Sequence, residues 1–338
     1  MSVSIRDVAD KAGVSYATVS RALNNKDSIR TATKERIIRI AKKMKYSPNR
    51  AAQVLAGNKV TTGARLKNIS IIFDRKTSMN DSYFSQIVRN IEKETVSFSD
   101  ISISITSLSN QYKDFLDISK RLKDNLVGGI ILFGNFSNET VALFEKHFKN
   151  CVLVDKPSQQ ISSIINDNKK GAFEAVSHLI KQGCRKIAFI NGPERHYFSK
   201  AILEGYKEAL GTNYDKKLCT KGDFHTESGY QAMKEIFARN YQPDGLFTND
   251  EMAFGAMRAM KEEGLKIPED ISVIGFDNLY WSSHIDPPLS TVKVNYAYMA
   301  RTAVRKIIEN FNEDRIIHTT TTIPVELIIR KSTEAKGG

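Results

Sequence analysis

The sequence has few cysteines and no long hydrophobic run. Its 338 residues include three cysteines, Cys151, Cys184 and Cys219, with no Cys-x-x-Cys pair, which argues against a disulfide framework and a zinc cluster. No stretch approaches the roughly 18 consecutive apolar residues that a membrane helix needs. The N-terminus also lacks the apolar core of a signal peptide. We therefore expect a cytoplasmic protein with buried thiols and no membrane partner.

Signatures of catalysis are also missing. The sequence contains no Gly-x-Ser-x-Gly elbow, no Walker loop and no His-Glu-x-x-His motif. Its six histidines do not pair at metal-ligand spacing, and Gly128-Gly129 leads into a strand-like run rather than out of one. These absences predict that the chain is not an enzyme and needs no metal or cofactor.

Positive charge is concentrated in the first sixty residues. This segment holds thirteen Lys and Arg against four Asp and Glu, a net charge of +9 out of +12 for the whole chain. A compact basic module on a nearly neutral body is typical of nucleic-acid-binding proteins. A solvated basic tail or a helix on a membrane surface is the alternative, but the apolar pattern of the segment argues against a mere tail.

Apolar residues at helical spacing predict three short helices in this basic segment: residues 5–12, about 16–24 and 31–45. Ala9, Gly13 and Val19 have the spacing of a helix-turn-helix motif. Small Ala9 permits a close helix crossing, Gly13 makes the turn, and Val19 enters the core. Ser15 is placed to cap the second helix.

A fourth short helix is expected in the segment 47–60. Pro48 suits the beginning of a helix and Gly57 its end. A helix of this length is unstable alone in water. It therefore needs a partner, and a second copy of itself on DNA would serve.

Beyond residue 60, short apolar runs alternate with amphipathic helical segments. Strands are predicted at 69–73, 101–105, 127–133, 151–154, 186–190, 218–221, 245–248 and 272–276, with helices between most of them. This alternation implies parallel, doubly wound sheets, and two such runs in succession imply two lobes. Ligands of such folds bind where the carboxyl ends of the strands meet.

Together these motifs resemble the lac/galactose repressor (LacI/GalR) family of bacterial transcriptional regulators. Residues 7–24 are similar to the family's DNA-binding head, and 48–57 to its hinge helix. Three blocks of the body match as well, at 243–256, 267–277 and 287–292. The resemblance covers essentially the whole chain and is weakest between residues 60 and 150. It implies a small all-α helix-turn-helix head on an α/β body of two doubly wound, parallel-sheet lobes, periplasmic-binding-protein-like (type I), with a sugar site in the cleft.

The resemblance also implies a division of labour along the chain. Residues 1–46 would form the helix-turn-helix head, 47–60 the hinge helix and linker, and 61–338 the body for effector binding and dimerisation. A homodimer would bind a pseudo-palindromic operator in double-stranded DNA, because two-fold protein symmetry needs two-fold DNA symmetry. The C-terminus lacks a leucine heptad, so we expect no coiled-coil tetramer.

The same resemblance assigns DNA contacts. The base contacts would come from Tyr16, Ala17, Arg21 and Leu55. Arg21 suits the edge of a guanine, and Leu55 suits a wedge in a minor-groove step. For Leu55 the alternative is packing against the body, and for Tyr16 it is a plain surface aromatic. The backbone contacts, which position without specifying sequence, would come from Ser15, Thr18, Ser20, Asn24, Asn49 and Arg50.

Effector contacts are carried over from the family in the same way. They are Asp155, Phe224, Asn249, Asp250, Asp277 and Tyr296, most of which follow predicted strands. Asp277 would accept hydrogen bonds from ligand hydroxyls. For two of these residues the alternative is a purely structural role. Asp250 would be the N-cap of a helix over 252–263, and Phe224 would be an ordinary core residue.

One departure from the family pattern concerns the effector. The family usually has an arginine three residues before the Gly-Tyr that stands here at Gly205-Tyr206, and this chain has Ile202 instead. Lys200 or Arg195 would have to replace it. Otherwise the ligand is not a typical simple sugar, or the site is altered.

Two other functions fit parts of the sequence. A solute-binding protein of sugar transport would have the same body, but the basic head and the missing signal peptide oppose it. A DNA-binding protein without effector control is the second alternative. We expect a regulator, and a repressor in particular, whose effector is a small carbohydrate.

Overall fold

The computed structural model describes residues 5–23, 31–44, 66–74, 82–98, 101–108, 114–313 and 315–334. The chain divides into two compact units, Met1–Arg65 and Leu66–Gly338, called here the head and the body. The predicted hinge helix at 47–60 lies outside the described residues. None of the described helices is both long enough and apolar enough to span a membrane.

The head contains the three predicted helices, α1 (Ile5–Ala12), α2 (Tyr16–Leu23) and α3 (Thr31–Lys43). Gly13 has φ +61° and forms the turn between α1 and α2, a conformation that glycine adopts without strain. Ser15 caps α2 as predicted, since its Oγ accepts a hydrogen bond from the Thr18 N–H at 3.2 Å. The core of the head is built from small and branched residues: Val8, Ala9, Ala12, Val19, Ala22, Ile37 and Ala41.

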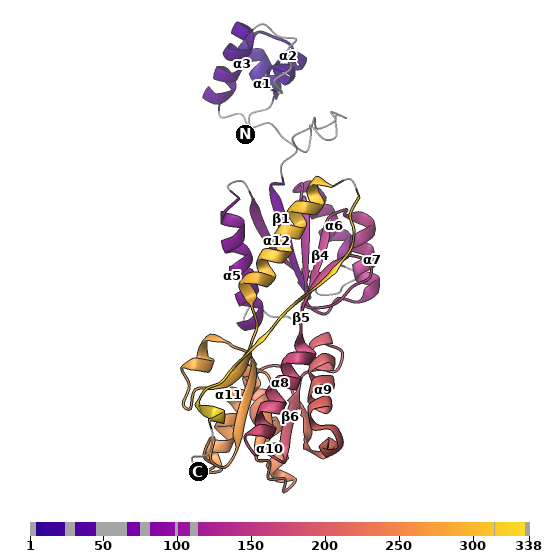
Figure 1. Cartoon of the computed structure of the whole chain (residues 1–338). Helices are drawn as coiled ribbons and strands as arrows, with labels where there is room; N and C mark the ends of the chain where they lie inside the picture. Colours follow the sequence, from indigo (N-terminus) through magenta and orange to yellow (C-terminus); the bar gives the residue numbers. More distant parts are fainter. Residues whose placement is uncertain are drawn as a thin grey trace. The chain divides into compact units, whose positions relative to one another are not determined.

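The body has two lobes, each a six-stranded sheet between two pairs of helices (Figure 1). In the N-terminal lobe the strand order is β11-β5-β4-β3-β1-β2 and every pair is parallel. Its strands are β1 (Asn68–Asp74), β2 (Ser102–Leu108), β3 (Gly129–Phe133), β4 (Cys151–Val154), β5 (Ser162–Asn166) and β11 (Thr320–Ile323). Its helices are α5 (Ser82–Val96), α6 (Phe115–Asp124), α7 (Asn138–His147) and α12 (Tyr296–Asn312).

In the C-terminal lobe the strand order is β12-β10-β9-β8-β6-β7. All neighbours are parallel except β10 and β12, which are antiparallel. The strands are β6 (Ile187–Asn191), β7 (Cys219–Lys221), β8 (Gly245–Phe247), β9 (Ser272–Asp277), β10 (Ser290–Lys293) and β12 (Glu326–Ile328). The α-helices are α8 (Asn168–Lys181), α9 (Tyr197–Leu210), α10 (Thr226–Ala238) and α11 (Asp250–Glu262), with short 3-10 turns η1 (Gly211–Asn213), η2 (Lys216–Leu218), η3 (Tyr280–Ser283) and η4 (Lys331–Thr333).

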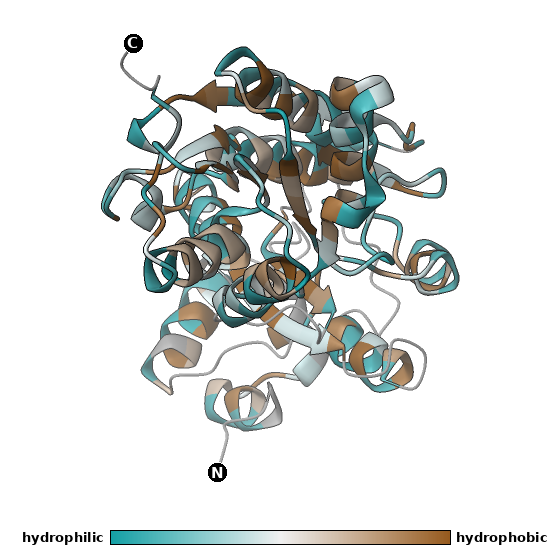
Figure 2. Ribbon diagram, turned by 90° about the horizontal axis from the view of Figure 1, so that it is seen from below, coloured by the Kyte–Doolittle hydropathy of each residue, from teal (hydrophilic) through white to brown (hydrophobic). Residues whose placement is uncertain are grey.

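The chain passes between the lobes at 166–168, 293–296 and 323–326 (Figure 1). The central strands are buried along nearly their whole length because helices cover both faces of each sheet, and Figure 2 shows many of them in the hydrophobic colour. The strands and helices predicted for the body are confirmed. The antiparallel β10–β12 pair departs from the all-parallel expectation, and it arises because the last crossing returns the chain to the C-terminal lobe.

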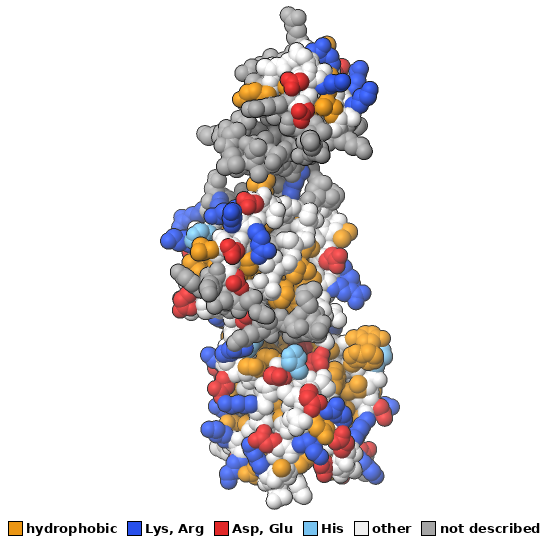
Figure 3. Space-filling view, turned by 180° about the vertical axis from the view of Figure 1, so that it is seen from behind, with side chains coloured by type: hydrophobic (Ala, Val, Ile, Leu, Met, Phe, Trp, Pro, Cys, Tyr) orange, Lys and Arg blue, Asp and Glu red, His pale blue; other side chains and the backbone are white. Residues whose placement is uncertain are grey.

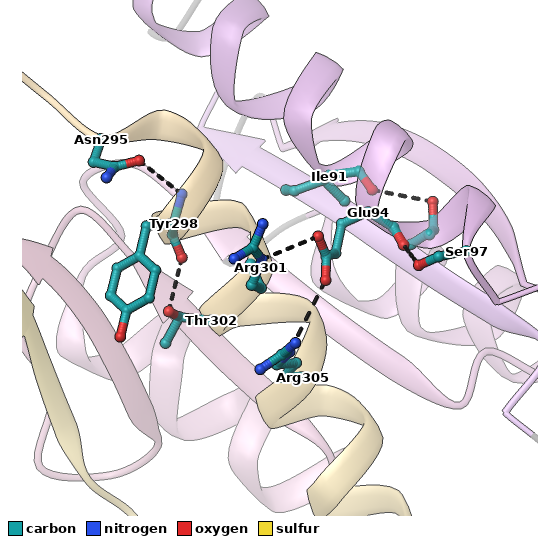
Figure 4. A network of polar contacts seen from close by, with 9 residues as sticks. Ile91, Glu94, Ser97, Asn295, Tyr298, Arg301, Thr302 and Arg305 are labelled. Carbon is teal, nitrogen blue, oxygen red and sulfur yellow. Dashed lines mark hydrogen bonds and ion pairs between the residues drawn. The ribbon is translucent and has the colours of Figure 1, made fainter.

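Helix α12 follows the C-terminal lobe in sequence but packs in the N-terminal lobe, against α5. Its buried face is Met299, Ala300, Ala303, Val304 and Ile307, the helical spacing of an amphipathic helix. At the rim of this contact the Glu94 carboxylate of α5 lies between Arg301 at 3.5 Å and Arg305 at 4.0 Å (Figure 4). Both arginines are largely exposed, so we expect these ion pairs to contribute little to stability.

Candidate functional site

A cavity lies where the two lobes meet. It encloses about 700 Å³ of empty space, part of it open to solvent. Both lobes contribute to its lining, which consists of Ser82, Tyr83, Phe133, Gly134, Asp155, His196, Phe198, Phe224, His225, Asn249, Glu251, Asp277 and Leu279. Many of these residues follow the carboxyl ends of strands, where ligands of doubly wound folds bind.

Four of the six predicted effector residues line this cavity: Asp155, Phe224, Asn249 and Asp277. Three of these four have positive φ, at 73° for Asp155, 75° for Phe224 and 114° for Asp277. Non-glycine residues avoid this region of backbone conformation, and such strain gathers at functional sites. The backbone therefore holds these side chains in place at some cost in free energy.

The ring of Phe224 belongs to an aromatic wall of the C-terminal lobe. It meets the rings of His196 at 5.2 Å and of Phe198 at 5.9 Å, centroid to centroid, and both contacts are edge-to-face. Phe198 in turn packs on Phe276 of β9. Phe224 is thus half-buried wall of the cavity rather than ordinary core.

Tyr83 occupies the N-terminal-lobe side of the cavity. Its hydroxyl donates to Oδ1 of Asp155 at 3.0 Å and accepts from Nδ2 of Asn166 at 3.2 Å. Burial, followed by the negative charge of Asp155, raises the pKa of Tyr83 well above its ordinary value, so the hydroxyl stays a donor. Its ring meets Tyr296 edge-on at 5.5 Å.

Tyr296 does not line the cavity but lies behind Tyr83. Its hydroxyl donates to the carbonyl oxygen of Asp277 at 3.0 Å. Because Tyr296 begins α12 in the N-terminal lobe and Asp277 ends β9 in the C-terminal lobe, this hydrogen bond joins the lobes. Tyr296 therefore supports Asp277 and Tyr83 in this structure, and its direct contact with an effector stays a prediction.

Asp250 likewise does not line the cavity, because its side chain is fully buried beneath it. Its Oδ1 accepts from the Thr291 hydroxyl at 2.6 Å, and its Oδ2 from the Ser282 hydroxyl at 2.5 Å and the Leu279 N–H at 2.8 Å. Burial raises the pKa of Asp250 to about 7, although these three hydrogen bonds act to lower it. Asp250 therefore holds the segment that follows Asp277.

The N-cap of α11 is Asn249, not Asp250. Asn249 Oδ1 accepts from the Met252 N–H at 3.2 Å, and its Nδ2 donates to the Phe224 carbonyl at 3.4 Å. The amide therefore orients the strained Phe224 as well as capping the helix. The sequence offered Asp250 as an N-cap for this helix, and the structure places the cap one residue earlier, at Asn249.

Sequence reasoning missed several cavity residues, among them Ser82, Tyr83, His196, Phe198 and Glu251. Glu251 directly follows two predicted site residues after the strand 245–248, so the strand-end rule could have found it. Ser82 and Tyr83 begin a helix whose sequence signal is only its apolar face.

Ile202 is fully buried in the hydrophobic core of the C-terminal lobe. Lys200 and Arg195 are both exposed, and neither is among the lining residues. Within the described part of the chain, the cavity therefore has no Lys or Arg in its lining, and neither proposed substitute takes the place of the family arginine.

In the head, the predicted DNA contacts that the structure describes lie on α2 or directly before it. The Tyr16 side chain is 63% exposed, which fits a residue free to reach a base. Ser15 and Thr18 share a hydrogen bond between their hydroxyls at 2.9 Å. Lys and Arg side chains gather along one side of the head (Figure 3). Ala17, Ser20 and Arg21 belong to the α2 backbone, but their side chains, and the whole of Asn24, Asn49, Arg50 and Leu55, lie outside the described residues.

Comparison with known proteins gives two family matches. Residues 4–49 match the model "Bacterial regulatory proteins, lacI family", and residues 176–333 match "Periplasmic binding protein-like domain". The head match contains the predicted helix-turn-helix, and the body match covers most of the C-terminal lobe.

Similar proteins align over nearly the full chain. The chain is 33% identical to "Probable HTH-type transcriptional repressor ExuR" of Bacillus subtilis, covering 92% of each chain. It is 31% identical to the HTH-type transcriptional repressor CytR of Escherichia coli, covering 98% of this chain and 96% of that one. A lac repressor dimer bound to operator and the anti-inducer ONPF matches with TM-score 0.80 and 29% identity, over 99% of this chain and 100% of that chain. The relatives are transcriptional repressors and not enzymes, and the chain belongs to the lacI family of bacterial regulatory proteins.

Proposed function

We propose that this protein is a transcriptional repressor that binds a pseudo-palindromic operator as a homodimer and is controlled by a small carbohydrate in the cavity between its lobes. The observation that carries the proposal is a cavity lined from both lobes in the same chain as a basic helix-turn-helix head. In this scheme residues 1–46 bind DNA, 47–60 form the hinge, and 61–338 bind the effector and the second subunit.

The chemistry of the cavity supports a hydroxyl-rich ring as effector. Aromatic rings stand on both sides, Tyr83 and Phe133 in one lobe and Phe198 and Phe224 in the other, and such faces pack on the apolar side of a sugar. The carboxylates of Asp155 and Asp277 are acceptors for hydroxyl groups. Because the lining comes from two lobes, a ligand that contacts both favours one arrangement of the lobes over others.

A surface of the C-terminal lobe supports the homodimer. A groove there is lined by Phe254, Met257 and Ile285 with Arg258, Lys261, Glu262 and Asp286 around them. Next to it, η3 carries Tyr280 and Trp281, which are 62% and 61% exposed. An apolar centre with a charged rim is typical of protein interfaces, and a two-fold dimer would place the same groove of two subunits face to face.

The head would enter the major groove with α2. Tyr16, Ala17 and Arg21 are the proposed base contacts, with Leu55 of the hinge in the minor groove. Ser15, Thr18, Ser20, Asn24, Asn49 and Arg50 are the proposed phosphate contacts. A net charge of +9 in the first sixty residues predicts a steep fall of DNA affinity with salt, because each neutralised phosphate releases counterions.

Control of DNA binding would follow from linkage. An effector that favours one lobe arrangement changes the spacing of the two hinge segments of the dimer and so forms or melts the hinge helices. The coupling is reciprocal, so operator DNA must change the affinity for the effector by the same factor. The lac repressor dimer bound to operator and anti-inducer is a structural precedent for both ligands on this fold.

The test begins with a thermal-shift screen of mono- and disaccharides, sugar phosphates and purines, since a ligand of the folded state raises the melting temperature. The affinity of each hit is then measured with and without an operator selected from random duplexes. A sugar that binds with different affinity in the two conditions supports the proposal. Equal affinities would contradict the coupling, and a sugar phosphate or purine as the only hit would contradict the carbohydrate.

The alternatives give different results in the same measurements. A solute-binding protein of sugar transport would bind sugar but select no operator. An effector-independent DNA-binding protein would select an operator whose affinity no ligand changes.

A further inference from the structure

Glu251 joins elements of both lobes through its side chain. Its Oε1 accepts from the Ser82 hydroxyl at 2.5 Å, and its Oε2 accepts from the Thr226 hydroxyl at 2.9 Å. Ser82 is the first residue of α5 and Thr226 the first residue of α10, while Glu251 lies in the first turn of α11. One carboxylate thus connects the beginnings of three helices.

The two hydrogen bonds have different structural consequences. Thr226 and Glu251 both belong to the C-terminal lobe, so their bond only ties α10 to α11. Ser82 belongs to the N-terminal lobe and is 169 residues away from Glu251 in sequence, so their bond crosses between the lobes. The carboxylate therefore uses one oxygen within its own lobe and the other oxygen across the lobes.

The position of this bridge relates it to the effector. Ser82 and Glu251 both line the cavity, and their sequence neighbours Tyr83 and Asn249 line it as well. A change in the distance between Ser82 and Glu251 therefore changes the shape of the cavity itself. A hydrogen bond to a charged group is stronger than one between neutral groups. This contact is therefore suited to favour one arrangement of the two lobes over others.

We propose that Glu251 is a positioning residue that holds the lobes together across the cavity, through the cross-lobe bond to Ser82. The bond favours the arrangement of the two lobes that is seen here. Its loss shifts the lobes toward more open arrangements by about tenfold, the typical effect of losing one hydrogen bond to a charged group. Any consequence for DNA binding rests on the proposed function, whereas the effect on the lobes does not.

The test measures the separation of the lobes in the full chain without any ligand. Spin labels are attached at Lys120→Cys on α6 and Ala238→Cys on α10, both at exposed positions, in a Cys219→Ser background, since Cys151 and Cys184 are buried. The labelled chain is diluted into unlabelled chain so that distances within one subunit dominate. Pulsed electron-spin resonance then gives the distribution of distances between the labels.

We expect one short distance for the parent chain and an added longer one for Ser82→Ala. Glu251→Gln should act in the same direction but more weakly, because its amide oxygen can still accept from Ser82 while the negative charge that strengthens the bond is lost. Ser82→Thr, which keeps a hydroxyl, should restore the short distance.

Thr226→Ala is the matched control, because it removes a hydroxyl from the same carboxylate within one lobe. An unchanged distribution in Ser82→Ala overturns the proposal, as does an equal change in Thr226→Ala. The operator affinity of the same variants is measured separately. If the lobes open but operator affinity stays constant, the proposed coupling to DNA fails while the role of Glu251 stands.

Discussion

The ring of Phe224 lies directly against Gly192. A β-carbon built on Gly192 would fall 1.9 Å from Cε1 and 2.1 Å from Cζ of that ring. Any residue other than glycine would therefore push Phe224 away, and the ring is a wall of the cavity. Gly192 is thus required by space and not by its backbone angles.

This contact makes Gly192→Ala a test of the cavity that spares the rest of the fold. We expect the variant to bind the effector found by the thermal-shift screen at least tenfold more weakly, an order of magnitude equivalent to about 1.4 kcal/mol. Titration calorimetry on the variant and the parent chain would measure the change. Gly183→Ala is a control, because no atom lies within 4 Å of a β-carbon built on Gly183, although its φ is +95°. Equal effector affinity in Gly192→Ala and the parent chain would remove Phe224 from the site.

A second prediction concerns the pH dependence of stability. The pKa of the Asp250 carboxyl is raised by burial from its ordinary 3.8 to about 7. Between these two pH values the folded chain holds a proton on Asp250 that the unfolded chain has lost. Stability therefore falls as the pH rises through this window, by up to about 1.4 kcal/mol per pH unit for this group.

Asp250→Asn does not titrate at this position and should lose that component of the slope. Urea unfolding at pH 4, 5, 6 and 7 would compare the two chains. Asp117→Asn, at an exposed position of α6, serves as a control and should keep the parent slope. Parallel curves for the parent chain and Asp250→Asn would mean that Asp250 stays ionised in the folded protein throughout this range.

Most of the architecture could be predicted from the sequence because the local apolar patterns and the family motifs indicate the same fold. The helix-turn-helix spacing and the alternation of strands and helices predict both the head and the doubly wound lobes. Helices α7 and α12 and strands β5 and β10 to β12 were not predicted. The lobe to which α12, β11 and β12 belong depends on where the chain crosses between the lobes. That is a tertiary choice which the apolar pattern of a single segment does not encode.

Only those site residues that come shortly after a predicted strand could be predicted from the sequence. Asp155, Phe224, Asn249 and Asp277 line the cavity, but neighbouring Asp250 points into the protein. These two adjacent polar residues at one helix start have different partners, and the hydroxyls of Ser282 and Thr291 that hold Asp250 come from segments far away in sequence. The pairing of Ser82 with Glu251 across the lobes could not be predicted from any local pattern, since the two residues are far apart in sequence.

A third prediction tests the homodimer. Ile285→Asp places a charge in the apolar groove of the C-terminal lobe and should convert the dimer to a monomer, because a buried unpaired charge in an interface costs several kcal/mol. Analytical ultracentrifugation measures the state, and circular dichroism checks that the fold is kept. Ile317→Asp is the control, since Ile317 is 72% exposed and is not part of the groove. A variant that remains dimeric would place the interface elsewhere.

The last prediction separates two ways of reading DNA. If Leu55 wedges into a minor-groove step and kinks the operator, Leu55→Ala should lose specific binding and keep non-specific binding, because the kink forms only on the specific site while the phosphate contacts remain. Arg21→Ala should instead cost about 1–3 kcal/mol at one base-pair position and relax the preference there. Binding of each variant to the selected operator, to its single-base variants and to random duplex, at two salt concentrations, distinguishes these outcomes. Equal loss of specific and non-specific binding in Leu55→Ala would exclude the wedge, because Leu55 would then support the fold of the hinge or its packing. An unchanged base preference in Arg21→Ala would mean that its guanidinium contacts a phosphate, and the salt dependence of binding would then be shallower than in the parent chain.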